Sequence, residues 1–203
     1  MNGNATVDVS RLPPVGFGPR APIWLGQVGM MLIEGTLFAV LLATYAYVAS
    51  GADVWPSPGV GTPDFWIPTI ALVVLLASCI PMYLGGEAAM RKDWTGVIVW
   101  TLINIAMAIV FLVLRTIEFN RLDFKWTSHI YGSIVWCTMG LHTMHAIADT
   151  CESAVIAAVV AMGWRREKQQ LAVKVDGIYW YFVAGIWIPF YFVFYIYPRL
   201  IRG

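Results

Sequence analysis

The sequence predicts an all-α, polytopic membrane helical bundle with five transmembrane helices. Of its 203 residues, 59% are hydrophobic and only 12% are charged, about half the charged fraction of an ordinary soluble domain. The apolar stretches are continuous and reach about 20 residues or more, the length of helix that crosses a hydrocarbon core of about 30 Å. Strands of a membrane barrel would instead alternate over about ten residues. A helical bundle satisfies the backbone of such segments in lipid.

Five predicted spans follow in order, at about residues 23–49, 65–90, 94–114, 128–164 and 178–200. The connection at 50–64 contains three glycines and three prolines, which excludes a further span there. Residues 91–93 form only a tight charged turn, and the fourth span is long enough to project beyond the membrane. Residues 1–22 form a polar arm without the apolar core of a signal peptide. We therefore expect one five-helix domain over residues 23–203.

Lysine and arginine residues favour an N-inside, C-outside orientation of this bundle. Eight lie on the side of the N-terminus, namely Arg11, Arg20, Arg91, Lys92, Arg165, Arg166, Lys168 and Lys174. Five lie on the opposite side, namely Arg115, Arg121, Lys125, Arg199 and Arg202. The first outer loop contains none. Because cytoplasmic loops carry an excess of Lys and Arg, we expect the N-terminus in the cytoplasm.

Net charge and cysteine content exclude other classes of protein. The net charge of +1 provides no field for binding a polyanion, so nucleic acid is not an expected partner. The three cysteines, Cys79, Cys137 and Cys151, lie inside apolar segments at spacings that match neither a zinc site nor a haem attachment. We interpret them as small buried apolar residues.

Ionisable residues inside the predicted spans are the candidate functional residues, because a charge in lipid is costly and needs a partner. The first span contains Glu34, and the fourth contains His142, His145, Asp149 and Glu152. The spacings of three, four and three residues place the latter four on one stripe of a helix. This stripe must face protein or a water-filled cleft.

Three interpretations of the stripe remain open. Imidazole and carboxylate groups can ligate a metal, but the other spans add only Glu34 and Glu87, fewer ligands than di-iron bundles use. Two histidines on one helix face cannot lie on opposite sides of a haem iron. The stripe can instead fix helix packing by hydrogen bonds, or handle protons or ions. We expect no catalytic, cofactor-binding or metal-ligating residue in this chain.

Polar residues near two helix ends are interpreted as local features. Glu118, with Arg115 and Arg121 nearby, lies where the third span should leave the membrane, so we expect a solvated surface contact. Thr127 and Ser128 are expected to cap the start of the fourth helix.

Two segments resemble subunit III of the haem-copper respiratory oxidases, a family that includes cytochrome c oxidase and its quinol-oxidising relatives. Residues 24–47, WLGQVGMMLIEGTLFAVLLATYAY, resemble the family's segment with a membrane-embedded carboxylate, and Glu34 takes the place of that carboxylate. Residues 140–145, GLHTMH, resemble its Gly-x-His-Gly-x-His motif at His142 and His145.

A third segment extends the resemblance to the last span. Residues 179–187, YWYFVAGIW, resemble the family's Tyr-Trp-His-Phe-x-Asp-x-x-Trp segment, with Tyr181 and Ala184 in place of the His and the Asp. Asp149 is a further departure, where the family usually has glycine. Five spans match the shorter bacterial form of the subunit, which lacks the first two of seven helices.

The resemblance implies an accessory subunit in a bacterial plasma membrane, with haem and copper in its partner subunits and none in this chain. It implies packing against catalytic subunit I, bound phospholipid and support of sustained proton uptake. Lipid phosphates are expected near the inner-side cations Arg91, Lys92, Arg165 and Arg166. An accessory subunit of a nitric oxide reductase system and a small ion or proton transporter are the alternatives.

Overall fold

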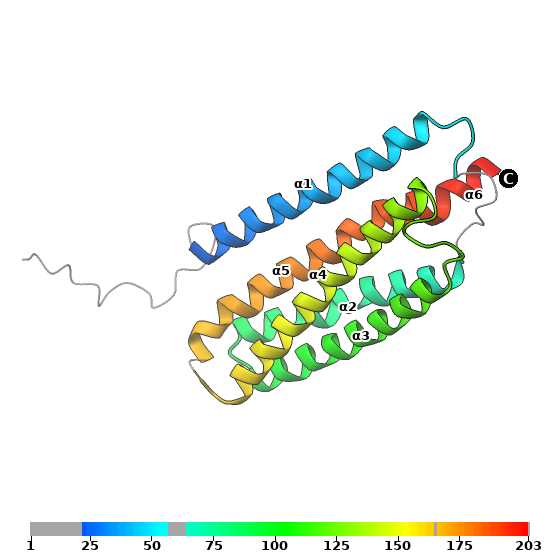
Figure 1. Ribbon diagram of the computed structural model, residues 1–203. Coiled ribbons are helices and arrows are strands. Elements are labelled where there is room, and N and C mark those ends of the chain that lie inside the picture. Colours follow the sequence, from blue (N-terminus) through cyan, green and yellow to red (C-terminus); the bar gives the residue numbers. More distant parts are fainter. Residues whose placement is uncertain (1–21, 57–63, 165, 203) are drawn as a thin grey trace, which may run out of the picture.

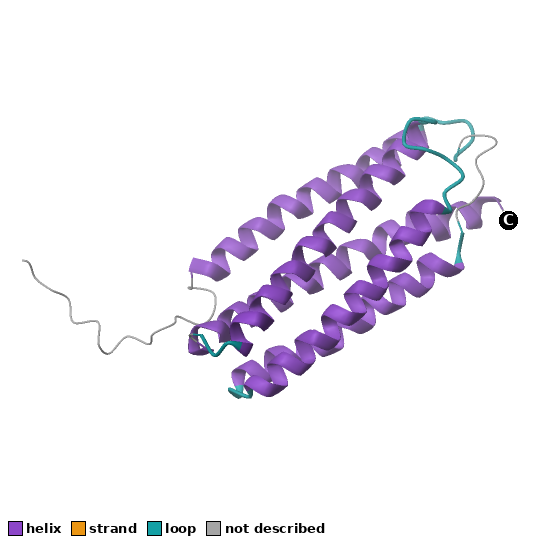
Figure 2. Ribbon diagram, turned by 60° about the horizontal axis from the view of Figure 1, so that its bottom comes forward, coloured by secondary structure: helices purple, strands orange, loops and turns teal. Residues whose placement is uncertain are grey.

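The computed structural model describes residues 22–56, 64–164 and 166–202, and within these ranges all regular structure is helical (Figure 2). The elements are α1 (Pro22–Ser50), α2 (Trp66–Met90), α3 (Trp94–Asn120), α4 (Ile130–Ala161), α5 (Arg166–Tyr191), the π-helical turn η1 (Phe192–Ile196) and α6 (Tyr197–Arg202). Five helices are long and apolar enough to span a membrane, the last running from α5 into α6. The predicted all-α bundle with five spans is confirmed. The predicted polar arm lies outside the described residues except for Pro22, which begins α1.

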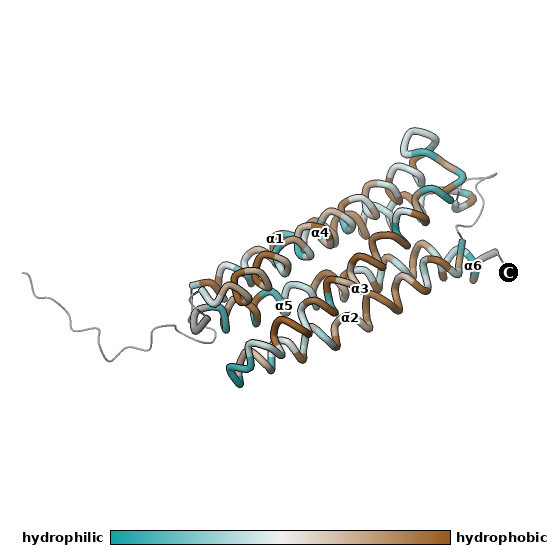
Figure 3. Tube along the Cα trace, turned by 90° about the horizontal axis from the view of Figure 1, so that it is seen from below, coloured by the Kyte–Doolittle hydropathy of each residue, from teal (hydrophilic) through white to brown (hydrophobic). Residues whose placement is uncertain are grey.

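Four of the helices form a ring, in which α2 packs on α3 and α5, and α4 packs on α3 and α5. α1 lies beside this group and packs mainly on α5 and α4 (Figure 1). The connections α1–α2 and α3–α4 lie at the end of the bundle that contains α6, and the connections α2–α3 and α4–α5 lie at the other end. Hydrophilic colours concentrate at these two ends in Figure 3, as expected for helices whose middles lie in lipid.

The core is aromatic and centres on α5 and η1. Trp180, Trp187, Phe190 and Phe194 are buried there. α1 contributes little to this core, and its apolar side chains are mostly exposed, as Ile33 is at 73%. In a membrane such apolar exposure faces lipid tails or a partner helix, because no water is present to penalise it.

α3 and α5 are longer than predicted, for two different reasons. α3 continues to Asn120 instead of ending near residue 114, because Arg115 and Glu118 neutralise each other inside the protein. α5 begins at Arg166 instead of residue 178. Residues 166–176 are rich in helix-forming Glu, Lys, Gln, Leu and Ala and contain neither Pro nor Gly.

α4 is shorter than predicted at both ends. The expected cap at Thr127 and Ser128 is wrong, because His129 is the N-cap and its Nδ1 accepts a hydrogen bond from the Gly132 N–H at 2.8 Å. The helix stops at Ala161 instead of residue 164. Gly163 has φ of 75°, and the N–H groups of residues 163 and 164 bond to the carbonyls of residues 160 and 159. This hydrogen-bond pattern is a Schellman motif, which favours glycine at its left-handed position.

Candidate functional site: a polar network between α1, α4 and α5

Glu34 lies where α1 meets both α4 and α5. The Tyr179 hydroxyl of α5 donates a hydrogen bond to Glu34 Oε2 at 2.7 Å. His145 Nε2 of α4 lies 3.5 Å from Glu34 Oε1. The side chains of Glu34 and His145 are 20% and 13% exposed, so the group is largely shielded within the chain. It joins the three helices through one carboxylate.

The hydrogen bonds of His145 constrain where its protons lie. Its Nδ1 lies 2.7 Å from the Leu141 carbonyl oxygen, which can only accept, so Nδ1 carries a proton. Nε2 faces Glu34 Oε1 at 3.5 Å, so a proton bound to either group there would lie between the two residues.

His142 lies deeper and does not join this group. It is fully buried, its Nε2–H donates to the Val183 carbonyl oxygen at 2.9 Å, and its ring centroid lies 4.5 Å from that of Trp187. Its Nδ1 has no partner among the described residues, and the rings of Phe38 and Phe111 that pack edge-on against it offer no ligand. The two histidines of the predicted stripe thus have different partners.

Asp149 and Glu152 belong to a second polar group, one turn and two turns beyond His145. Asp149 is 1% exposed and Glu152 is exposed at the surface. Asp176 of α5 completes the group, with one carboxylate oxygen from each of the three residues within 4.8 Å of the others. The Ser153 hydroxyl donates to Asp176 Oδ2 at 2.8 Å. The predicted stripe therefore faces protein at His142, His145 and Asp149 but not at Glu152.

Asp176 and Tyr179 were not predicted as site residues. The sequence pattern places Asp176 in the connection between the fourth and fifth predicted spans, where no helix face is expected. The apolar residues Leu171, Val173 and Val175 are the sequence feature that could have revealed Asp176. All three are buried, because α5 enters the bundle well before residue 178. Tyr179 lies inside the third family-like segment, but a tyrosine at a span end is usually an interfacial anchor.

A third polar group, at the opposite end of the bundle, corrects the expectation of a solvated contact at Glu118. Arg115 Nη1 donates to Glu118 Oε2 at 2.9 Å, and the two side chains are 1% and 3% exposed. The hydroxyl of the fully buried Tyr195 in η1 donates to Glu118 Oε1. The Arg115 guanidinium also lies 4.1 Å from the Trp187 ring centroid, within the range of a cation–π contact. The charges point into the bundle interior, where Trp187 of α5 and Tyr195 of η1 cover them.

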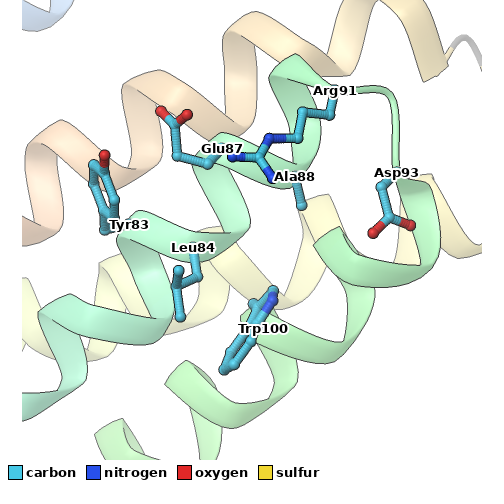
Figure 4. Close-up of a pocket in the computed structure, with 7 residues that line it drawn as sticks. All are labelled: Tyr83, Leu84, Glu87, Ala88, Arg91, Asp93 and Trp100. Atoms are coloured by element: carbon cyan, nitrogen blue, oxygen red, sulfur yellow. The ribbon is translucent and has the colours of Figure 1, made fainter.

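At the α2–α3 end, Arg91 borders a hollow of about 220 Å³. Its lining consists of Tyr83, Leu84, Glu87, Ala88, Arg91, Asp93 and Trp100. Figure 4 shows the Arg91 side chain extending back along α2 toward Glu87, with Trp100 on the facing helix α3. Glu87 accepts a hydrogen bond from Lys174 of α5 at 3.2 Å. The hollow thus combines the apolar side chains of Leu84, Ala88 and Trp100 with Arg91 and the carboxylates of Glu87 and Asp93.

The other predicted lipid contacts are less defined. Lys92 is exposed in the turn after α2, with φ of 59°. Arg165 and the side chain of Arg166 lie outside the described residues.

Comparisons with known proteins agree on one family. The model of the family described as "Cytochrome c oxidase subunit III" matches residues 21–199. Cytochrome c oxidase subunit 3 of Thermostichus vulcanus is 25% identical over 182 residues, covering 86% of this chain and 87% of the relative. That of Synechocystis is 24% identical over 178 residues, covering 84% and 74%. The probable cytochrome c oxidase subunit 3 of Mycobacterium tuberculosis is 28% identical over 176 residues, covering 84% and 86%. The matched residues include all five long helices.

Proposed function

The chain belongs to the cytochrome c oxidase subunit III family, and on this premise we propose that it is an accessory, non-redox subunit of a haem-copper terminal oxidase. It is a multi-pass membrane protein that forms a complex with other oxidase subunits. We place it in a bacterial plasma membrane, packed against the catalytic subunit that holds haem and copper.

One observation carries this proposal beyond the family match. The three segments that resemble the family lie far apart in the sequence, yet one residue from each meets at the Glu34–His145–Tyr179 group. A carboxylate, an imidazole and a phenol in contact at the α1, α4 and α5 junction can hold and exchange a proton without a redox cofactor. This arrangement supports a role in sustaining proton uptake by the complex.

The ligand geometry supports a non-redox role for the chain. Haem or copper needs histidine or sulfur ligands that converge on one point. His142 is bonded to a backbone carbonyl inside an aromatic shell, whereas His145 is paired with Glu34. The nitrogens of the two rings have different partners, so they do not form a common ligand set.

We propose that phospholipid binds at the end of the bundle where α2 turns into α3. The hollow beside Arg91 offers apolar walls from Leu84 and Trp100 for acyl chains. Arg91 at its rim and Lys92 in the adjoining turn are exposed, and such cations attract lipid phosphates. From the sequence we also expect Arg165 and Arg166 to contact lipid phosphates.

Purification of the native complex through a tag on this chain tests the proposal. We expect a haem-copper oxidase catalytic subunit to co-purify in mild detergent, identified by mass spectrometry and by its haem absorption spectrum. An untagged strain taken through the same steps is the control. Recovery of a nitric oxide reductase catalytic subunit instead would assign the chain to that system, and recovery of the chain alone would favour a transporter.

A further inference from the structure

The carboxylate group formed by Asp149, Glu152 and Asp176 is not explained by the proposed accessory role. Glu152 lies three residues after Asp149, on the same side of α4, and Asp176 faces them from α5. One oxygen of each residue lies within 4.8 Å of the others. Two oxygens that ligate one Ca²⁺ at about 2.3–2.6 Å can be at most about 5 Å apart, so the spacing fits a shared ion.

The buried members of the group lack the hydrogen bonds that a buried carboxylate requires. Asp149 is 1% exposed, and neither of its oxygens accepts a hydrogen bond from a donor among the described residues. Asp176 is 2% exposed, and its Oδ1 also accepts no hydrogen bond from a donor among the described residues. Buried polar atoms are otherwise almost always satisfied by protein, water or an ion. Asp149 and Asp176 face each other, so either a proton shared between the two carboxylates or a bound cation would satisfy these oxygens.

Among the described residues, the group has no positively charged side chain as a partner. Three carboxylates lie together, and no Lys or Arg in the part of the chain that the structure describes forms an ion pair with any of them. Lys174, two residues from Asp176, is engaged with Glu87 on the other side of α5. Uncompensated charge inside a membrane is costly, so a bound cation would stabilise the group.

We propose that Asp149, Glu152 and Asp176 form a binding site for a divalent cation of the oxygen-preferring class, such as Ca²⁺ or Mg²⁺, between α4 and α5. A set of carboxylate oxygens without sulfur or imidazole suits these hard cations. The Ser153 hydroxyl orients the Asp176 carboxylate through Oδ2 and leaves Oδ1 for the ion, as outer-shell groups do in metal sites. The exposed Glu152 provides access from the surface, and the ion joins α4 to α5.

Titration of the full-length chain with Mn²⁺ tests this proposal. The chain is purified in detergent, stripped with a chelator, and free Mn²⁺ is followed by electron paramagnetic resonance. We expect about one Mn²⁺ per chain, displaced by Ca²⁺ or Mg²⁺. Asp149→Asn and Asp176→Asn should each weaken Mn²⁺ binding at least about tenfold, as loss of metal-site groups commonly does.

Two variants make the result decisive. Glu152→Gln changes an exposed side chain, so it should fold normally by circular dichroism and still bind Mn²⁺ more weakly than the parent. Glu87→Gln removes a carboxylate that already has Lys174 as a partner, and it should bind Mn²⁺ like the parent. Absence of stoichiometric Mn²⁺, or equal binding by Glu152→Gln and the parent, would overturn the proposal. An equal loss in Glu87→Gln would also overturn it, because the effect would then be non-specific charge.

Discussion

The Glu34 side chain makes polar contacts from α1 to both α4 and α5. Its two oxygens have different partners, the phenol of Tyr179 and the imidazole of His145. A carboxylate in the first span is compatible both with proton handling and with helix packing. Substitutions that remove the charge, or only the hydrogen bond, separate these roles.

We predict that a Glu34→Ala oxidase complex starts at nearly the parent's rate of oxygen reduction and then loses activity faster with each turnover. The initial rate is retained because haem and copper lie in partner subunits. Oxygen consumption over many turnovers measures both quantities. Glu34→Gln should behave like Glu34→Ala, since it also lacks the charge.

Tyr179→Phe is the matched control for this experiment, because it removes the phenol hydrogen bond and keeps the carboxylate. It should lower the free energy of unfolding by about 1 kcal/mol and speed inactivation per turnover less than Glu34→Ala does, because Glu34 and His145 remain in place. If Glu34→Ala reduces assembly or thermal stability without faster inactivation, the residue serves packing alone. A loss of initial rate by orders of magnitude in an assembled complex would instead argue for direct catalysis.

At the scale of helices, the Arg115–Glu118 pair holds α3 against the last membrane segment. Tyr195 reaches Glu118 from η1, a π-helical turn that begins three residues after Pro189. Proline lacks the N–H that an α-helix needs at that position, and a π turn is a common feature of functional helix sites. The buried pair therefore ties α3 to an irregular stretch of the helix that contacts it.

We predict that Glu118→Ala lowers the free energy of unfolding by about 3–5 kcal/mol, because it leaves the Arg115 guanidinium buried without a counter-charge. Unfolding in a gradient of denaturing detergent, followed by circular dichroism, measures this change. The double variant Arg115→Met, Glu118→Leu removes both charges and should be much closer to the parent. Equal destabilisation by the single and double variants would contradict a dominant role for the unpaired charge.

At the scale of the whole molecule, the bundle has two chemically different ends. The structure places the α2–α3 and α4–α5 connections together at one end. Three of the cations counted for orientation form ion pairs within the protein, Arg115 with Glu118, Lys174 with Glu87 and Arg121 with Asp64. Leaving them out changes the count from eight against five to seven against three, so the charge bias still favours a cytoplasmic N-terminus.

Cysteine labelling in intact cells tests this orientation. Cys79, Cys137 and Cys151 are first replaced by alanine. Asp123→Cys, in the α3–α4 connection, should then react with a membrane-impermeant reagent added outside. Arg91→Cys, in the α2–α3 turn, should react only after the membrane is permeabilised. The opposite pattern would place the N-terminus outside.

The sequence alone predicted features that depend on local composition. Span number, helical class and the boundaries of α1 and α2 follow from apolar runs and from Pro- and Gly-rich connections, which act within a few residues along the chain. The ends of α3, α4 and α5 were predicted less well. A buried ion pair extended α3, and a polar but helix-forming stretch extended α5, so hydropathy was misleading at both points.

The same distinction between local sequence and tertiary contacts applies to the candidate site. The sequence by itself identified Glu34, His142, His145, Asp149 and Glu152 as the unusual residues, because ionisable groups stand out in apolar spans. Only the tertiary structure decided their partners. It paired Glu34 with His145 and Tyr179, separated His142 from them, and brought Asp176 to Asp149. The physical reason is that helix rotation and contact are set by packing between residues distant in sequence, which the period of a single helix does not encode.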